Sequence, residues 1–244
     1  MPLSSNTLLH LTKEKSALLG ILEESFKVFF CRETFEMNNQ TLTARIPMVS
    51  FCDIPLSEVK NHIESYGHYG IGLTKAWATR QRLNPVLYLE PNSLLATSVN
   101  GALQKLIADD ASESLSEAQY DLADMIRYIK NYEGVLNRKD GTRRIYRFSD
   151  EREWRYVPPR SDYPALLETD ETYAADPPKA DAALSSLRLT FEPEDIKYII
   201  IRDDSEISEF LHHLRTAKGR KYSHYEIERL TTRLLTTEQI LGDV

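Results

Sequence analysis

The chain has 244 residues, a formal net charge of −7, 41% hydrophobic residues and 27% charged residues. These values are ordinary for a globular protein with a sizeable core, and the negative charge argues against nonspecific nucleic-acid binding, which needs a basic surface. Cys31 and Cys52 form neither a disulfide framework nor a CxxC metal motif. The chain begins without a signal-peptide pattern, and no apolar run approaches the ~20 residues that span a bilayer. We therefore expect a cytoplasmic protein without a membrane segment.

The first third of the chain predicts short strands separated by helices. Residues 6–12 read as a strand, and 13–24 have the leucine spacing of a helix. The polar stretch 32–44 predicts an exposed loop or a hairpin. A compact apolar strand follows at 46–51, and the proline-led segment 55–66 predicts a helix.

The middle of the chain changes from strands to a helical pattern. Glycines after the second helix lead into a strand at 71–75, and another strand is expected at 86–89 after an Asn-Pro turn. Residues 91–136 show helical stripes with a break near their centre. Two neighbouring strands, 143–148 and 153–157, are then predicted, joined around Ser149-Asp150.

The last third begins with a proline-containing acidic stretch, residues 158–186, which predicts a long loop. Strands are expected at 187–191 and 196–201. An amphipathic helix covers 203–214, and residues 225–240 form either a helix or a strand.

The elements are interspersed without regular βα alternation, which favours an α+β fold over a doubly wound one. We predict a single domain over residues 1–244, built on a bent, mixed, mostly antiparallel sheet with flanking helices. Its helical insertion covers about 91–136, and about 158–186 form a mobile acidic loop. The strands expected at the centre of the sheet are 46–51, 71–75, 86–89, 153–157 and 196–201.

The sequence EREWRY at 151–156 is the sharpest chemical feature. On a strand, Glu151, Glu153 and Arg155 project to one face. Two close carboxylates raise one another's pKa, which suits acid/base work or orientation of a ribose hydroxyl. Arg155 could instead neutralise both in a structural ladder, so an ion-pair role and a ligand-contacting role both stay open.

Other polar residues give weaker signals. His10 and Thr12 share an early strand, and Tyr66 and Tyr69 lie among glycines, which let a flat ligand approach the backbone. The simpler interpretation places the histidine in ordinary packing and the tyrosines on the sheet. The histidines lack the spacing of metal ligands, so no metal is expected. The sequence GTRRIYR at 141–147 is either a local basic patch or a solvated hairpin tip.

Five segments together resemble a known family: LLHLT, VSFCDIPLSEVKNHIESYGHYGIGLTKAW, NPVLYLE, EREWRY and LTTRLLTTEQI, which span 8–240. The chain is similar to the AbiGi family, the antitoxin half of bacterial abortive-infection phage-resistance systems. The resemblance implies a cytoplasmic antiviral defence protein that restrains a neighbouring nucleotidyltransferase-like toxin. It brings no established catalytic residues.

A more distant similarity is to ADP-ribosyltransferases, with their His-Tyr-Glu layout. That likeness implies that His10 contacts the ribose of NAD, that Tyr66 or Tyr69 stacks on nicotinamide, and that Glu153 orients a ribose hydroxyl. The chain departs from the layout in its unclear middle tyrosine and in the helical insertion before the glutamate. The alternative function is therefore an NAD-dependent transferase, with candidate catalytic residues Glu153, His10 and Glu151 and candidate ligand-binding residues Thr12, Tyr66, Tyr69 and Arg155.

Overall fold

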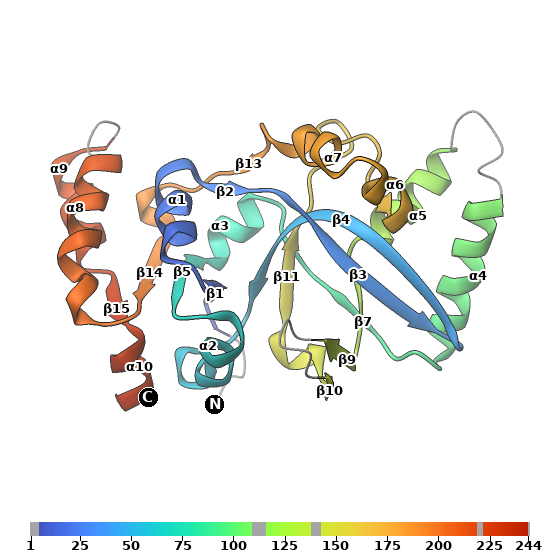
Figure 1. Cartoon of the computed structure of the whole chain (residues 1–244), viewed down its shortest axis with the longest axis horizontal. Helices are drawn as coiled ribbons and strands as arrows, with labels where there is room; N and C mark the ends of the chain where they lie inside the picture. Colours follow the sequence, from blue (N-terminus) through green and yellow to red (C-terminus); the bar gives the residue numbers. More distant parts are fainter. Residues whose placement is uncertain (1–4, 109–115, 138–142, 219–221, 244) are drawn as a thin grey trace. The chain divides into compact units, whose positions relative to one another are not determined.

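The computed structural model describes residues 5–108, 116–137, 143–218 and 222–243 (Figure 1). The chain divides into two compact units. Unit 1 contains Met1–Lys27, Val49–Asn84 and Arg188–Val244, and unit 2 contains Val28–Met48 and Pro85–Leu187.

The fold contains both strands and helices, in mixed order along the chain. The strands are β1 (Thr7–Thr12), β2 (Phe26–Lys27), β3 (Phe29–Met37), β4 (Gln40–Cys52), β5 (Tyr69–Thr74), β6 (Asn84–Pro85), β7 (Leu87–Leu89), β8 (Ile129–Asn131), β9 (Gly134–Asn137), β10 (Arg143–Tyr146), β11 (Glu153–Tyr156), β12 (Glu168–Thr169), β13 (Arg188–Leu189), β14 (Ile196–Ile201) and β15 (Leu234–Thr236). The α-helices are α1 (Lys15–Glu24), α2 (Lys60–Tyr66), α3 (Lys75–Arg80), α4 (Leu94–Ala108), α5 (Glu117–Ile126), α6 (Asp170–Ala175), α7 (Pro177–Leu184), α8 (Ile207–Lys218), α9 (His224–Thr231) and α10 (Thr237–Asp243). Short 3₁₀ helices are η1 (Leu56–Glu58), η3 (Phe148–Glu151), η4 (Pro193–Asp195) and η5 (Asp204–Glu206).

The main sheet has the strand order β15-β14-β5-β1-β4-β11-β6, and β3 and β12 also pair with β4. Strand β14 pairs with β15 in parallel, whereas the pairs β1–β4, β1–β5, β5–β14 and β3–β4 are antiparallel. The sheet is therefore large, mixed and mostly antiparallel. With its flanking helices it confirms the predicted α+β class.

In unit 1, helices α1, α2 and α3 pack beside β1 and β5. Gly67 ends α2 at φ 115°, a left-handed conformation that suits glycine. A Cβ atom at this position would lie 2.4 Å from the carbonyl oxygen of Thr12. The glycine therefore lets the helix end approach the last residue of β1 closely.

In unit 2, β3 and β4 form a long hairpin, drawn as the two blue strands in Figure 1. The two turn residues, Asn38 and Asn39, both have positive φ (49° and 63°). Asparagine tolerates this conformation, and two such residues give the primed turn whose twist matches the flanking strands. Of the two predictions for 32–44, the hairpin is therefore confirmed and the loop is wrong.

Several predicted elements differ from the structure. The helical pattern over 91–136 stops at Ile126, and two short strands, β8 and β9, follow it. The predicted strand 86–89 lies outside the main sheet, because β7 pairs in parallel with β8. Strand β10 pairs with β9, and η3 separates it from β11. Each of these strands forms its backbone hydrogen bonds with a segment elsewhere in the chain, which the local sequence pattern does not identify.

The stretch 158–186, predicted as a loop, contains helices α6 and α7. The side chain of Thr169 accepts a hydrogen bond from the N–H of Thr172, and that of Asp176 accepts one from the N–H of Lys179. These are N-caps, and Pro177 and Pro178 occupy the first turn of α7, where proline is tolerated. Over 170–184 the loop prediction was therefore wrong, because Pro177 and Pro178 start a helix. That the rest of 158–186 is a mobile loop stays a prediction.

Candidate functional site

Strand β11 carries Glu153 and Arg155 of the EREWRY motif into the interior of unit 2. Glu153 and Arg155 are two positions apart, so their side chains leave the strand on the same face. Both are buried, Arg155 completely. The backbone is fixed in place, since the N–H of Glu153 donates to the Tyr88 hydroxyl (2.8 Å) and its carbonyl accepts from the N–H of Val86 (3.0 Å).

These two residues belong to a charge cluster, which consists of Glu33, Lys130, Glu151, Glu153 and Arg155. Arg155 Nε lies 2.5 Å from Glu153 Oε1, and Arg155 Nη2 lies 3.1 Å from Glu33 Oε1. Lys130 Nζ is 2.8 Å from Glu153 Oε2, 3.8 Å from Glu33 and 4.0 Å from Glu151. Each carboxylate of the cluster therefore faces at least one cation.

Hydrogen bonds to the backbone complete the cluster. Arg155 Nη1 donates to the carbonyl of Arg127 (2.9 Å) and that of Ile129 (3.4 Å). The buried Arg127 in turn donates from Nη1 to the carbonyl of Pro158 (2.9 Å). Because buried charges are tolerated only when paired and hydrogen-bonded, this arrangement accounts for how two guanidinium groups remain in the interior.

The cluster holds Glu153 and Lys130 in their ionised forms. Burial raises the pKa of Glu153, but the charges of Arg155 and Lys130 outweigh burial and lower that pKa to about 2. Burial lowers the pKa of Lys130, yet Glu153 and Glu33 hold it above its ordinary value. A general acid or base works best with a pKa near the operating pH. In this state Glu153 is suited to pairing rather than to proton transfer.

The other carboxylate of the motif, Glu151, lies outside strand β11. Glu151 lies in η3, and the next residue, Arg152, has a left-handed φ of 46°. The predicted strand at 153–157 is therefore confirmed by β11, but Glu151 precedes that strand and does not share its alternation. Glu151 is nevertheless buried and lies 4.0 Å from Lys130.

Sequence reasoning missed Glu33 and Lys130. Glu33 had a usable signal, because along β3 it shares its parity with Cys31, Phe35 and Met37, which face the interior. Lys130 had none: it lies in a three-residue strand within a stretch that was assigned to a helix. Burial raises the pKa of the neighbouring Cys31 thiol to about 11, which keeps it a neutral thiol.

The early predicted residues lie in unit 1. In the β1–β5 ladder, Thr12 pairs with Tyr69 and His10 pairs with Ile71, so His10, Thr12 and Tyr69 share one face of the sheet. The Tyr69 hydroxyl donates to Glu206 (2.8 Å). Tyr66 stacks on the His62 ring at 6.2 Å.

His10 belongs to an aromatic cluster, which consists of His10, Phe26, Phe51, Trp77 and Phe191. Its ring meets Phe26 edge-on at 5.2 Å and lies 5.6 Å from Phe51. His10 Nδ1 lies 2.9 Å from the Ser50 carbonyl. Burial lowers the His10 pKa, and the Ser50 carbonyl offsets part of that effect. The ring is therefore held neutral among aromatic neighbours.

The structure brings Glu151, Glu153 and Arg155 together in unit 2, and His10, Thr12 and Tyr69 onto one sheet face in unit 1. Because these groups lie in different units, a joint cleft of His10, a tyrosine and Glu153 stays a prediction. The internal partners of Tyr69, Glu153 and Arg155 favour a structural role for each of them.

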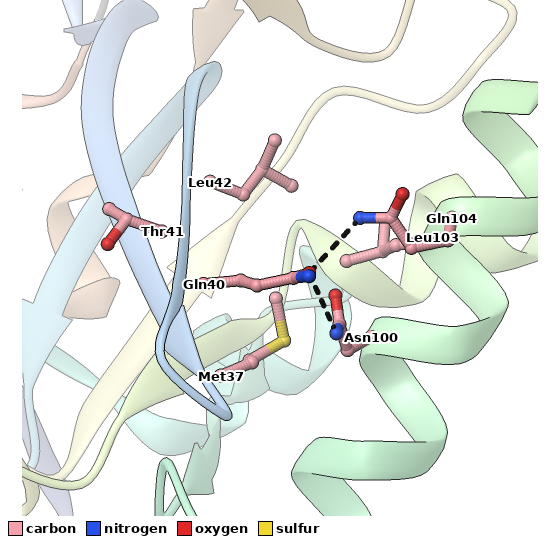
Figure 2. A pocket seen from close by; sticks show the side chains of 7 residues that line it. All are labelled: Met37, Gln40, Thr41, Leu42, Asn100, Leu103 and Gln104. Atoms are coloured by element: carbon pink, nitrogen blue, oxygen red, sulfur yellow. Dashed lines mark hydrogen bonds between the residues drawn. The ribbon is translucent and has the colours of Figure 1, made fainter.

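A small hollow lies in unit 2 between the tip of the β3–β4 hairpin and α4 (Figure 2). Gln40 Oε1 accepts hydrogen bonds from Asn100 Nδ2 (3.0 Å) and Gln104 Nε2 (3.3 Å) across it. Its volume is about 70 Å³, well below the roughly 300 Å³ of small ligand sites. The amides therefore fasten the hairpin to the helix, and the space does not fit a dinucleotide.

Fold and site together define an α+β protein whose buried charges are paired with one another. A family model described as "Putative abortive phage resistance protein AbiGi, antitoxin" matches residues 24–202. The match covers most of the chain, which therefore belongs to the AbiGi family of abortive-infection phage-resistance antitoxins. Membership of an antitoxin family implies a cognate toxin partner.

The chain is also similar to an "Abortive phage resistance protein AbiGi" of Lactococcus lactis subsp. cremoris. The two are 28% identical over 220 residues, which cover 81% of this chain and 88% of that protein. No solved structure matches the chain. The comparisons lend no support to the similarity to ADP-ribosyltransferases. Among the described residues, no helix is long and apolar enough to cross a membrane.

Proposed function

We propose that this chain restrains a toxin encoded beside it, by binding that toxin directly in the cytoplasm, and that the toxin is nucleotidyltransferase-like. The observation that carries the proposal is the match of residues 24–202 to an antitoxin family. The toxin type comes from the family resemblance. The net charge of −7 favours a protein partner over DNA, because binding to phosphates needs a basic face.

The charge cluster supports a binding role over a catalytic one. Glu153 and Arg155 are almost fully buried, and each is engaged by charged partners within 3.1 Å. A catalytic carboxylate must be able to reach its substrate, and a catalytic pKa is tuned toward the working pH. The cluster meets neither condition, whereas a rigid interior suits a protein that presents a fixed surface to a partner.

The test is co-expression with the product of the neighbouring gene in bacteria. Toxin and antitoxin are placed under two unrelated inducible promoters, so that transcriptional repression by the antitoxin cannot account for rescue. We expect the neighbour alone to stop growth, induction of this chain to restore it, and the two proteins to co-purify. Growth arrest that persists despite soluble antitoxin would contradict the proposal.

The alternative, an NAD-dependent ADP-ribosyltransferase, rests on the shared sheet face of His10, Thr12 and Tyr69. Calorimetric titration with NAD tests it directly. A saturable heat of NAD binding, together with turnover of NAD that Glu153→Gln abolishes, would support the transferase function. An absence of binding heat at millimolar NAD would contradict that function.

A further inference from the structure

The hairpin formed by β9 and β10 stands apart from the main sheet. Within the described part of unit 2, the two strands pair only with one another, with Ile145 opposite Val135 and Tyr146 opposite Gly134.

One face of this hairpin is apolar and open to solvent. Ile145 is 79% exposed, and its cross-strand neighbour Val135 is 43% exposed. Directly opposed residues of an antiparallel pair project to the same face, so the two side chains form one aliphatic surface. A β-branched pair exposed on a strand edge is a hazard for aggregation unless a partner covers it.

The base of the hairpin is firmly attached. Tyr146 and Phe148 pack edge-on at 5.5 Å, and the Phe148 ring lies 5.0 Å from Lys130 Nζ of the charge cluster. A Cβ atom at Gly134 would come within 3.1 Å of Phe148, so glycine allows this close packing. The buried charges therefore hold the base of the hairpin, which presents its surface in a preorganised form.

The charge of the hairpin opposes that of the chain. Residues 143–148 contain three arginines and no carboxylate, in a chain whose net charge is −7. Arg147 is exposed, and its guanidinium lies 5.8 Å from the Tyr132 ring. The complementary partner surface has an apolar centre bordered by carboxylates. A nucleic acid would match the arginines but would leave Ile145 and Val135 without apolar partners, so the pattern favours a protein.

We propose that the β9–β10 hairpin is the surface by which this antitoxin binds its toxin. Ile145 and Val135 form the centre of the contact, and Arg147 binds an acidic rim. The inference rests on the proposed function, because that function requires a contact with the toxin and the inference locates this contact on the chain.

The test compares Ile145→Asp with Leu94→Asp in full-length protein. Leu94 is an equally solvent-exposed aliphatic residue of unit 2, 88% exposed at the first position of α4, where a carboxylate is favourable. Affinity for the purified neighbouring-gene product is measured by biolayer interferometry, and rescue of growth is measured in the two-promoter assay. We expect Ile145→Asp to weaken binding at least about tenfold and to lose rescue, while Leu94→Asp and the conservative Ile145→Val retain both. Equal melting temperatures would show that both aspartate variants fold.

The outcomes separate this inference from the proposed function. Wild-type binding that Ile145→Asp leaves unchanged would overturn the hairpin surface and leave the antitoxin role intact. A wild-type chain that neither binds nor rescues would overturn the proposed function itself. A homodimer that Ile145→Asp dissociates in light scattering would overturn the toxin as occupant, as would RNA or DNA binding that the same variant abolishes in fluorescence anisotropy.

Discussion

The interiors of the two units are stabilised in different ways. In unit 1 the aromatic cluster fills the space with rings whose centroids lie 5.2 to 6.4 Å apart, and its one titratable group, His10, is held neutral. In unit 2 the charge cluster places a fully buried arginine among carboxylates. Apolar packing tolerates the loss of a few atoms, because the neighbours relax partly. A paired charge does not, since its partner remains buried and unneutralised. The comparison predicts that unit 2 is the more sensitive to single substitutions and to acid.

The largest expected effect is that of Arg155→Ala. The substitution leaves both Glu153 and Glu33 without their arginine, so we expect a loss of about 5 kcal/mol of unfolding free energy. Urea denaturation measures it. Arg160→Ala removes a surface arginine paired with Glu117 and serves as the control, at below about 1 kcal/mol. Equal losses in the two variants would mean that the cluster does not stabilise the unit.

The second largest effect is expected from acid, which should destabilise the interior of unit 2 more than that of unit 1. The folded-state pKa of Glu153 is about 2, below its ordinary value of 4.5. Its stabilisation is therefore complete above about pH 4.5 and is lost as pH falls toward 2. The shift corresponds to roughly 3 kcal/mol. Urea midpoints at pH 6 and pH 3 should show about 2 kcal/mol of it, because pH 3 still lies above the folded-state pKa. Glu153→Gln should be less stable than the wild type at pH 6 and should lose less stability between pH 6 and pH 3. If the stability of both proteins falls equally with pH, the acid sensitivity does not come from Glu153.

A smaller loss is expected from Phe51→Leu in the aromatic cluster. Phe51 touches His10, Phe26 and Trp77, but leucine keeps most of the buried apolar area. We expect a cost of about 1 to 2 kcal/mol, measured by the same urea titration. A cost as large as that of Arg155→Ala would remove the contrast between the two interiors.

His10 gives a weaker pH effect. Its folded-state pKa lies below its ordinary value, so the unfolded chain takes up the proton first as pH falls. Stability should decline below about pH 6.5, by at most roughly 1.4 kcal/mol per pH unit, until the folded-state pKa is reached. The difference in urea midpoint between wild type and His10→Leu, followed from pH 7 to pH 5, isolates this term. If this difference in midpoint stays constant from pH 7 to pH 5, protonation of His10 does not contribute to the pH dependence of stability.

The smallest expected difference is between the unfolding midpoints of the two units. The chain passes between them at 27/28, 48/49, 84/85 and 187/188, so neither unit is a continuous segment. The single-domain prediction is therefore one that unfolding measurements can test. Trp77 reports on unit 1 and Trp154 on unit 2. Fluorescence of Trp154→Phe and of Trp77→Phe, each relative to circular dichroism of the same variant, should give coincident transitions. Separate transitions within one variant would indicate two domains.

Local sequence predicted much of the fold. The apolar run of β14 and the β-branched and apolar residues of β1 were identified as strands because burial on a sheet needs such side chains. The alternation Glu153-Trp154-Arg155 placed its two charged residues on one face, and β11 confirms this. The α+β class followed from the irregular order of the elements.

The residues that decide the site came together only through tertiary structure. Glu33, Lys130 and Glu153 lie on β3, β8 and β11, and no local pattern relates positions on three separate strands. The same holds for 129–137, where pairing with β7 and β10 gave strands in a stretch with helical spacing. The sequence by itself therefore determined which segments could be buried and whether their apolar residues recur with the spacing of a helix or of a strand, because side-chain chemistry and backbone geometry are local. Only the tertiary structure decided which charges neutralise one another, because in a low-dielectric interior that choice depends on the distances between strands.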